Sequence, residues 1–334
     1  MTIAELSKLK KVLIIRLSSL GDILLTTPFI RAIKNQFPEI EIDFLLRKEY
    51  SDILKLSPYL NKVFSYSRAE KDNLQILEEI KKSKFDLVID LQNNLRSKKI
   101  VSKLDTESIR FSKNGWKKFL LVNFKINKLK DALQIPVRYA QALSDFQLDG
   151  KGLDLFTDRG PSAALDKKEN LIGFCPGARH FTKRWPQEYF IELGKKLTDT
   201  GYIIILFGGK IDQELCSVIA NEITGSIDLS NNDDILQTTA DMKLCKAVIC
   251  NDSGLMHTAS AVKTKVAAIF GSTVKEFGFT PYNCSNLILE NNSLTCRPCS
   301  HVGRNSCPKK HFECMQSIKP DSVFEKVTSF ISDK

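Results

Sequence analysis

The 334-residue sequence lacks any apolar run near the roughly 20 residues that a membrane-spanning helix needs. The stretch Met1–Lys11 is polar and basic, with no apolar core, so we expect no signal peptide. The sequence has neither a Gly-x-Gly-x-x-Gly motif after a strand nor a Walker A motif, which argues against NAD-binding and P-loop proteins. No loop carries Asp-x-Asp, a pair of carboxylates that would hold a divalent metal ion.

The composition is that of a globular protein, with 43% hydrophobic and 26% charged residues. The length suits two domains of ordinary size. Nine cysteines without an expected export signal indicate reduced thiols in a cytoplasmic compartment.

Positive charge is concentrated in the first half of the chain. Residues 1–150 hold 27 Lys and Arg against 18 Asp and Glu, whereas the remainder holds 22 against 21. The basic half predicts an anionic partner. Nucleic acid, an anionic lipid and a phosphorylated glycolipid all fit this charge.

Short apolar runs alternate with amphipathic stretches, a pattern typical of parallel sheets covered by helices. Residues 149–168 are rich in Gly, Asp and Pro and predict the link between two domains. The expected strands are Val12–Ile15, Ile42–Leu46, Val63–Tyr66, Leu87–Asp90, Leu171–Cys175, Ile203–Phe207, Ser226–Asp228, Ala247–Cys250 and Val266–Phe270. The expected helices are Ile23–Phe37, Tyr50–Leu56, Asn73–Lys82, Pro186–Asp199, Gln213–Asn221, Asp233–Lys243, Ser253–Val262 and one from Asp321.

The loop after the first expected strand carries a single carboxylate, Asp22. The strand breaks at the small residues Ser18–Gly21, and a helix follows. Ligands of open α/β sheets bind beyond the carboxyl ends of strands, so Asp22 can take a proton from a substrate hydroxyl. Alternatively, Asp22 only caps the helix, since Asp is a favoured cap.

A second loop at a strand end, Pro176–Pro186, is cationic. Lys183 in this loop can stabilise a departing phosphate, and the neighbouring Thr182 can donate a hydroxyl to it. The alternative for Lys183 is a solvated surface lysine.

A third loop carries Asp252, Ser253 and Gly254 just before a helix. Free backbone N–H groups and the helix dipole make such a helix start an anion site, and glycine lets the ligand approach closely. His257 lies one turn further along the same helix face and either touches phosphate or packs in the core.

These three blocks, in this order, resemble glycosyltransferase family 9, the bacterial ADP-heptose:lipopolysaccharide heptosyltransferases. The blocks are Ser-Leu-Gly-Asp ending at Asp22, Lys-x-Trp-Pro from Lys183 and Asp-Ser-Gly-x-x-His from Asp252. The resemblance extends from Val12 to about Pro281, and the cysteine-containing tail is similar to one branch of the family.

The resemblance implies an α/β fold with GT-B architecture, two Rossmann-like domains with parallel sheets facing across a cleft. We expect an acceptor-binding domain over residues 1–155. A nucleotide-sugar-binding domain is expected over residues 165–334, with a cysteine-containing segment at 284–314.

The resemblance also implies roles for single residues. Asp22 is then the catalytic base, and Lys183 binds the sugar-phosphate part of the donor. Asp252 contacts sugar hydroxyls, with an ordinary helix cap as the alternative, while Asp212 contacts the ribose and adenine lies near Asp228–Asp233. The expected donor-binding set is Thr182, Asp212, Asp252, Ser253, Gly254 and His257.

Residues 95–130 combine many lysines and arginines with aromatic residues. This combination at helical spacing predicts a membrane-surface element. In the alternative, the basic face is solvated and the aromatics belong to the core. The residues expected to face the acceptor or the membrane are Lys98, Lys99, Trp116, Lys117 and Lys118.

The spacing of Cys296, Cys299, Cys307 and Cys314 can hold a tetrahedral structural zinc, with His301 and His311 as alternates. Four reduced thiols packed in a loop, or a disulfide formed on oxidation, are the alternatives. No cofactor is required by the expected chemistry.

With these features, the resemblance implies an inverting, metal-independent glycosyltransferase that moves heptose from ADP-heptose to the lipopolysaccharide inner core. Its expected partners are the ADP-heptose donor, a phosphorylated glycolipid acceptor and the cytoplasmic face of the anionic inner membrane, with no nucleic acid. One alternative is a family 9-like transferase that uses another nucleotide sugar or acceptor. Another is a non-catalytic basic protein that binds nucleic acid.

Overall fold

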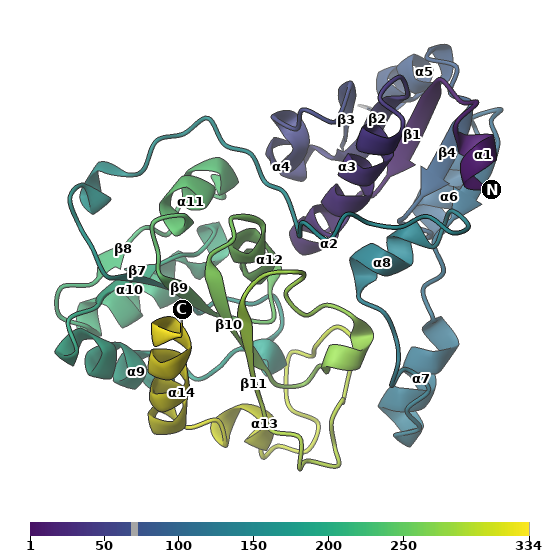
Figure 1. Ribbon diagram of the computed structural model, residues 1–334. Coiled ribbons are helices and arrows are strands. Elements are labelled where there is room, and N and C mark those ends of the chain that lie inside the picture. The colour runs from purple at the N-terminus through teal and green to yellow at the C-terminus, as the bar shows by residue number, and fades with distance from the viewer. Residues whose placement is uncertain (68–72, 334) are drawn as a thin grey trace. The chain divides into compact units, whose positions relative to one another are not determined.

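The computed structural model describes residues 1–67 and 73–333 and divides the chain into two compact units. The first unit comprises residues 1–114 and 133–156, and the second comprises 115–132 and the chain from 157 onward. Each unit is built on its own parallel sheet (Figure 1).

The first unit has five parallel strands in the order β3-β2-β1-β4-β5. These strands read as continuous apolar runs because helices cover both faces of such sheets. The strands are β1 (Lys11–Ile15), β2 (Glu41–Arg47), β3 (Lys62–Tyr66), β4 (Leu87–Asp90) and β5 (Ser108–Arg110). The helices are α1 (Ile3–Leu6), α2 (Leu20–Leu24), α3 (Thr27–Gln36), α4 (Asp52–Lys55), α5 (Asn73–Lys82), α6 (Leu95–Val101) and α8 (Ile135–Ala140).

The second unit has six parallel strands in the order β11-β10-β9-β6-β7-β8. On one face, α9 and α14 pack against each other beside the sheet (Figure 1). The strands are β6 (Leu171–Cys175), β7 (Ile203–Leu206), β8 (Ile227–Asp228), β9 (Ala247–Asn251), β10 (Lys265–Phe270) and β11 (Asn286–Glu290). The helices are α7 (Gly115–Phe124), α9 (Gln187–Asp199), α10 (Gln213–Glu222), α11 (Ile235–Met242), α12 (Gly254–Ala261), α13 (Glu313–Gln316) and α14 (Pro320–Ser332).

The nine expected strands are confirmed, each within about one residue of its expected ends. Two strands were missed, β5 because it has only three residues and β11 because it is a partly exposed edge strand. The single expected helix Ile23–Phe37 is wrong, since the chain forms α2 and α3 instead. Pro28 stands in the first turn of α3, where its missing N–H and its ring prevent the helix from running through.

The first domain was expected to comprise residues 1–155. The segment 115–132 belongs to the second unit instead. Leu121 and Leu129 from this segment form a small buried cluster with Phe277. The Nζ of Lys125 also donates hydrogen bonds to the carbonyl oxygens of Cys296 and Pro298, at 3.2 and 2.7 Å. Hydrophobic contacts between residues far apart in sequence therefore decide the membership of this segment.

The link between the units is tied to the first unit by Arg31 of α3. This buried guanidinium pairs with Asp149 and Asp154 and donates to the carbonyl oxygen of Gly152. Burial alone would lower the pKa of Arg31, but the two carboxylates outweigh burial and raise this pKa, so the guanidinium is charged.

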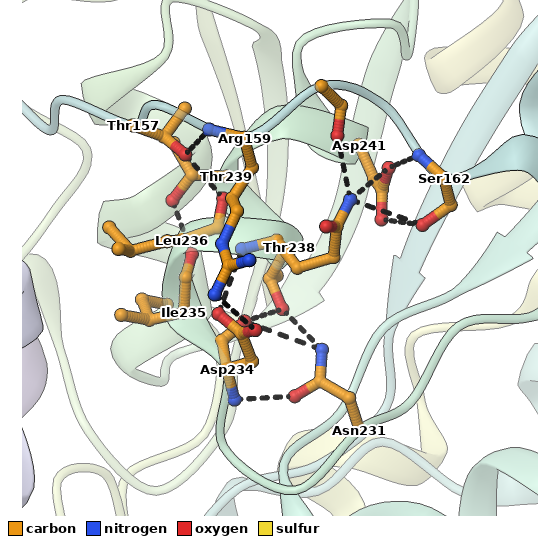
Figure 2. Close-up of polar contacts among 12 residues, drawn as sticks. Thr157, Arg159, Ser162, Asn231, Asp234, Ile235, Leu236, Thr238, Thr239 and Asp241 are labelled. Carbon is orange, nitrogen blue, oxygen red and sulfur yellow. Dashed lines mark hydrogen bonds and ion pairs between the residues drawn. The ribbon is translucent and has the colours of Figure 1, made fainter.

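The link is tied to the second unit by α11 (Figure 2). The backbone N–H and the hydroxyl of Ser162 donate to the two carboxylate oxygens of Asp241, at 2.7 and 2.8 Å. The hydroxyl of Thr157 donates to the carbonyl of Leu236. These two sets of contacts explain why the division falls between Phe156 and Thr157, next to the expected boundary.

Candidate functional site

Each sheet reverses its strand order once, between β1 and β4 in the first unit and between β6 and β9 in the second. Ligands of doubly wound sheets bind at such switch points, beyond the carboxyl ends of the strands. Asp22 follows β1, Lys183 follows β6 and Asp252 follows β9. The predicted residues therefore lie at two switch points, one in each unit.

Asp22 makes the contacts of a helix cap and also stays partly open to solvent. It is the third residue of α2 and closes a capping box, since one carboxylate oxygen accepts from the N–H and the hydroxyl of Ser19. The other oxygen lies 2.6 Å from the guanidinium of Arg16, and the side chain is 20% exposed. A capping aspartate that is partly open to solvent keeps lone pairs for a substrate proton.

The pKa of Asp22 is set by opposing effects. Burial raises it, but the charge of Arg16 and the hydrogen bonds from Ser19 outweigh burial and lower the pKa below its ordinary value. Asp22 is therefore ionised at neutral pH, the form that accepts a proton.

Arg16 is a contact of Asp22 that the sequence reasoning missed. Its buried guanidinium also donates to the carbonyl of Leu91 and lies over the ring of Tyr139, at 5.8 Å from the centroid. The loop between Arg16 and Asp22 is fixed by the segment after β4, because Gln92 accepts from the N–H groups of Leu17 and Ser18. An arginine six residues before the carboxylate was the available signal.

Lys183 and Asp252 meet at the switch point of the second sheet. Lys183 Nζ lies 2.7 Å from Asp252 Oδ2, with both side chains largely buried. The hydroxyl of Thr273 donates to the same oxygen at 2.6 Å. Lys183 is thus not a solvated surface lysine, and Asp252 is not the cap of α12, since Ser253 occupies that position.

The loop that carries Lys183 is held at both ends by Asn251, a residue the sequence reasoning also missed. The buried amide of Asn251 donates to the carbonyl of Pro176 at 2.7 Å and accepts from the N–H of Trp185 at 3.0 Å. Trp185 is itself buried and donates its ring N–H to the carbonyl of Ile318. Asn251 is the last residue of β9, and this position could have indicated its bridging role.

The start of α12 retains the features of an anion site. Ser253 has extended backbone angles and makes no side-chain cap. Its hydroxyl oxygen is buried and bonds to no other residue in the described part of the chain. The first N–H groups of a helix, here from Gly254 onward, have no partner within the helix. His257 is buried, which favours the packed-core alternative over direct phosphate contact.

Asp212 lies beside the same site. It follows β7, the neighbour of β6, and a Cβ at Gly177 would overlap its carboxylate. Burial raises the pKa of Asp212, which the hydrogen bond from Gly209 and the charge of Arg184 only partly offset. The expected adenine segment 228–233 adjoins it, since Asp233 accepts from the N–H of Lys210.

The predicted contact of Thr182 with phosphate is not what the structure shows. Thr182 is only 1% exposed. Its hydroxyl accepts from the N–H of Arg304 at 2.8 Å and donates to Ser272 Oγ at 3.0 Å. The Thr182 hydroxyl thus both donates and accepts a hydrogen bond inside the protein.

The four predicted zinc ligands line one cavity of about 20 Å³ together with His311. His311 Nε2 lies 3.8 Å from Cys296 Sγ. Yet within residues 1–67 and 73–333, no three His, Cys, Asp or Glu side chains are arranged to hold a metal ion. Zinc therefore stays a prediction from the spacing. Elemental analysis of untagged protein decides it, because substoichiometric zinc with freely titrating thiols leaves only the packing alternative.

The expected membrane-facing residues fall into two groups. Lys98 and Lys99 lie exposed on α6 of the first unit, whereas Trp116, Lys117 and Lys118 lie on α7 of the second. The aromatics of α7 do not belong to the core, since Trp116 is 69% exposed and stacks on the half-exposed Phe119. No helix in the described ranges combines the length and the apolar character of a membrane span.

The family model described as glycosyltransferase family 9 (heptosyltransferase) matches residues 74–310. Lipooligosaccharide heptosyltransferase 2 of Campylobacter jejuni subsp. jejuni serotype O:2 is 27% identical over 327 residues, covering 94% of this chain and 96% of the relative. A glycosyl transferase family 9 structure from Veillonella parvula superposes with TM-score 0.76 at 20% identity, covering 96% of this chain and 97% of that one. The Escherichia coli ADP-heptose lps heptosyltransferase II structure gives TM-score 0.73 at 22% identity, covering 96% of this chain and 98% of that one.

These likenesses confirm the expected α/β fold of the GT-B type. Since the family match covers well over half of the sequence, the chain belongs to glycosyltransferase family 9 and is a glycosyltransferase.

Proposed function

We propose that this glycosyltransferase transfers heptose from ADP-heptose to the lipopolysaccharide inner core, with inversion at the anomeric carbon. The observation that carries the proposal is the Lys183–Asp252 pair next to the uncapped start of α12. This arrangement offers a cation and helix amides to a diphosphate, and a carboxylate to sugar hydroxyls. The Campylobacter jejuni relative and the Escherichia coli structure are named for heptose transfer, which supports the choice of sugar.

In the proposed reaction, Asp22 takes the proton of the acceptor hydroxyl. The hydroxyl oxygen then forms a bond to the anomeric carbon, and the bond from that carbon to the phosphate oxygen breaks. ADP leaves with the electron pair, and its negative charge is stabilised by Lys183 and the N–H groups at Gly254. One displacement by the acceptor itself, with no covalent enzyme intermediate, inverts the configuration.

The proposal assigns no step to a divalent metal ion. Lys183 provides the positive charge, and the helix dipole of α12 adds a partial positive charge at the same place. Adding EDTA to the purified enzyme should therefore leave the rate unchanged. A loss of activity that Mg²⁺ restores would contradict the proposed metal independence but not the proposed transfer of heptose.

The transfer assay combines the protein, ADP-heptose and a purified inner-core acceptor that lacks the heptose. ADP release and a mass gain of one heptose on the acceptor support the proposal. UDP- and GDP-sugars serve as controls, and a clear preference for one of them would favour the alternative donor. Absence of any transfer, together with tight binding of nucleic acid, would favour the non-catalytic alternative.

We further propose that α7 rests on the anionic cytoplasmic face of the inner membrane. Exposed Trp116, Phe119 and Phe124 lie on a helix that also carries Lys117 and Lys118. Aromatic side chains enter the interface between headgroups and acyl chains, while lysines are attracted to anionic lipid. All nine cysteines are free, as a reducing compartment would keep them.

Charge reversal by Lys117→Glu and Lys118→Glu should reduce co-sedimentation with anionic vesicles. Each Lys near such a surface contributes about 1 kcal/mol, and salt screens the attraction. The matched control reverses Lys81 and Lys82, two exposed lysines at the end of α5. Equal vesicle binding by both double variants and the parent protein would exclude α7 as the membrane contact.

A further inference from the structure

The cysteine-containing tail touches the turn that carries Lys183. Residues 296–304, here called the clamp segment, pair with this turn through Thr182. The N–H of Thr182 donates to the carbonyl of Arg304 at 3.0 Å, and the N–H of Arg304 donates to the Thr182 hydroxyl at 2.8 Å. The residue beside the catalytic lysine is therefore bonded in both directions to the tail.

The close approach of the two segments depends on a glycine. Gly303 has a φ of +107°, and a Cβ there would lie 2.6 Å from the Cβ of His180. On the other side of the turn, Phe181 stacks on Phe312, with ring centroids 4.8 Å apart. The tail thus packs against the turn over Phe181–Lys183, although Phe181 stays 47% exposed.

The clamp segment is in turn fixed to the sheet by Arg297. Its buried guanidinium donates to the carbonyls of Gly271 and Thr273, at 2.6 and 2.9 Å, and pairs with Glu290 at the end of β11. Thr273 is also the residue whose hydroxyl donates to Asp252. Arg297 therefore holds the loop that orients the partner of Lys183.

Ser272 completes the connection between the two sides. Its hydroxyl accepts from Thr182 Oγ1 at 3.0 Å, and its carbonyl accepts from the N–H of Cys299 at 3.3 Å. Thr182 and Ser272 are both almost fully buried. The turn with Lys183, the loop after β10 and the clamp segment thus share one buried hydrogen-bond network.

We infer that the clamp segment is the positioning element of the donor site, with Thr182 and Ser272 as positioning residues that act through Lys183. The inference rests on the proposed binding of the donor diphosphate by Lys183. A lysine side chain on a short turn between strand and helix has many rotamers. Fixing the turn reduces the conformational entropy that is lost when the lysine binds a phosphate. The tail would then serve nucleotide affinity without touching the nucleotide.

A double-mutant cycle with ADP as the probe tests this role. Thr182→Val keeps the shape of the side chain and removes the hydroxyl, so it should weaken ADP binding about tenfold by calorimetry. Ser272→Ala should weaken it in the same direction. Thr182→Ser keeps the hydroxyl, and this variant should bind ADP within about twofold of the parent protein.

In a Lys183→Ala background, neither Thr182→Val nor Ser272→Ala should weaken ADP binding further, because residues that act through one group are not additive. Thr264→Val is the matched control. Thr264 is buried in the same unit and donates to the carbonyl of Met242, before β10 and away from the strands' carboxyl ends. Its ADP affinity should equal that of the parent.

Three results would overturn the inference. Losses that add to that of Lys183→Ala would show that Thr182 and Ser272 act elsewhere, and unchanged ADP affinity of both single variants would show no positioning at all. Unchanged ADP affinity of Lys183→Ala by itself would remove the lysine from the donor site and the inference with it. If Thr182→Val does not fold, the Ser272→Ala arm of the cycle decides the question alone.

Discussion

Replacing Asp22 by asparagine should lower the rate of heptose transfer by about 10²-fold or more while the affinity for ADP stays unchanged. Asparagine is nearly isosteric and can still accept from Ser19, but it cannot take the acceptor proton. ADP binding is spared because the proposed donor residues belong to the second unit and Asp22 to the first. The measurement is initial rate on the purified acceptor, with calorimetry on ADP.

The variant also leaves Arg16 as a buried charge without its carboxylate, which lowers stability. Asp149→Asn is therefore the matched control. Asp149 lies in the same unit, and its carboxylate accepts two hydrogen bonds from the buried guanidinium of Arg31, which hold its pKa below its ordinary value. It should lose stability but keep transfer. Near-normal turnover of Asp22→Asn would contradict the assignment of the base.

The lowered pKa of Asp22 fixes the sign of its pH dependence. The ionised form, and the stability that its pair with Arg16 contributes, are present above the ordinary aspartate value of 3.8. Both are lost only as the pH falls through the lower pKa of the folded state. Transfer between about pH 5 and 8 should show no loss from protonation of Asp22.

Replacing Lys183 by alanine should weaken ADP binding about tenfold and slow transfer by about 10²-fold. The ammonium contacts phosphate before the reaction and more strongly as charge develops on the leaving group, so affinity and rate fall together. Asp252 loses its ion-pair partner at the same time, and thermal unfolding should be recorded alongside.

The control for this variant is Lys196→Ala on α9, a lysine that pairs with Asp321 at 2.7 Å away from the switch point. Its ADP affinity and turnover should match those of the parent. If Lys183→Ala also keeps both values, Lys183 does not bind the donor phosphate.

Local sequence determined most of the regular structure. Most of the nine predicted strands were evident because parallel strands buried on both faces are continuous apolar runs, such as Leu171–Cys175 and Ala247–Asn251. The loops after these strands were evident as well, because small and charged residues interrupt the apolar runs there. The order of three such loops, which carry Asp22, Lys183 and Asp252, was enough to show the resemblance of the chain to one family of enzymes.

The tertiary structure alone decided which groups meet. Lys183 meets Asp252, and Thr182 meets Arg304, although the residues of each pair are at least 69 positions apart in the sequence. Such pairing depends on which strands lie side by side, and no local pattern records it. The membership of segment 115–132 in the second unit has the same origin, because Leu121 and Leu129 are buried in a cluster with Phe277. The sequence by itself therefore indicated the chemical groups of the proposed site, and strand adjacency and burial decided which residues contact them.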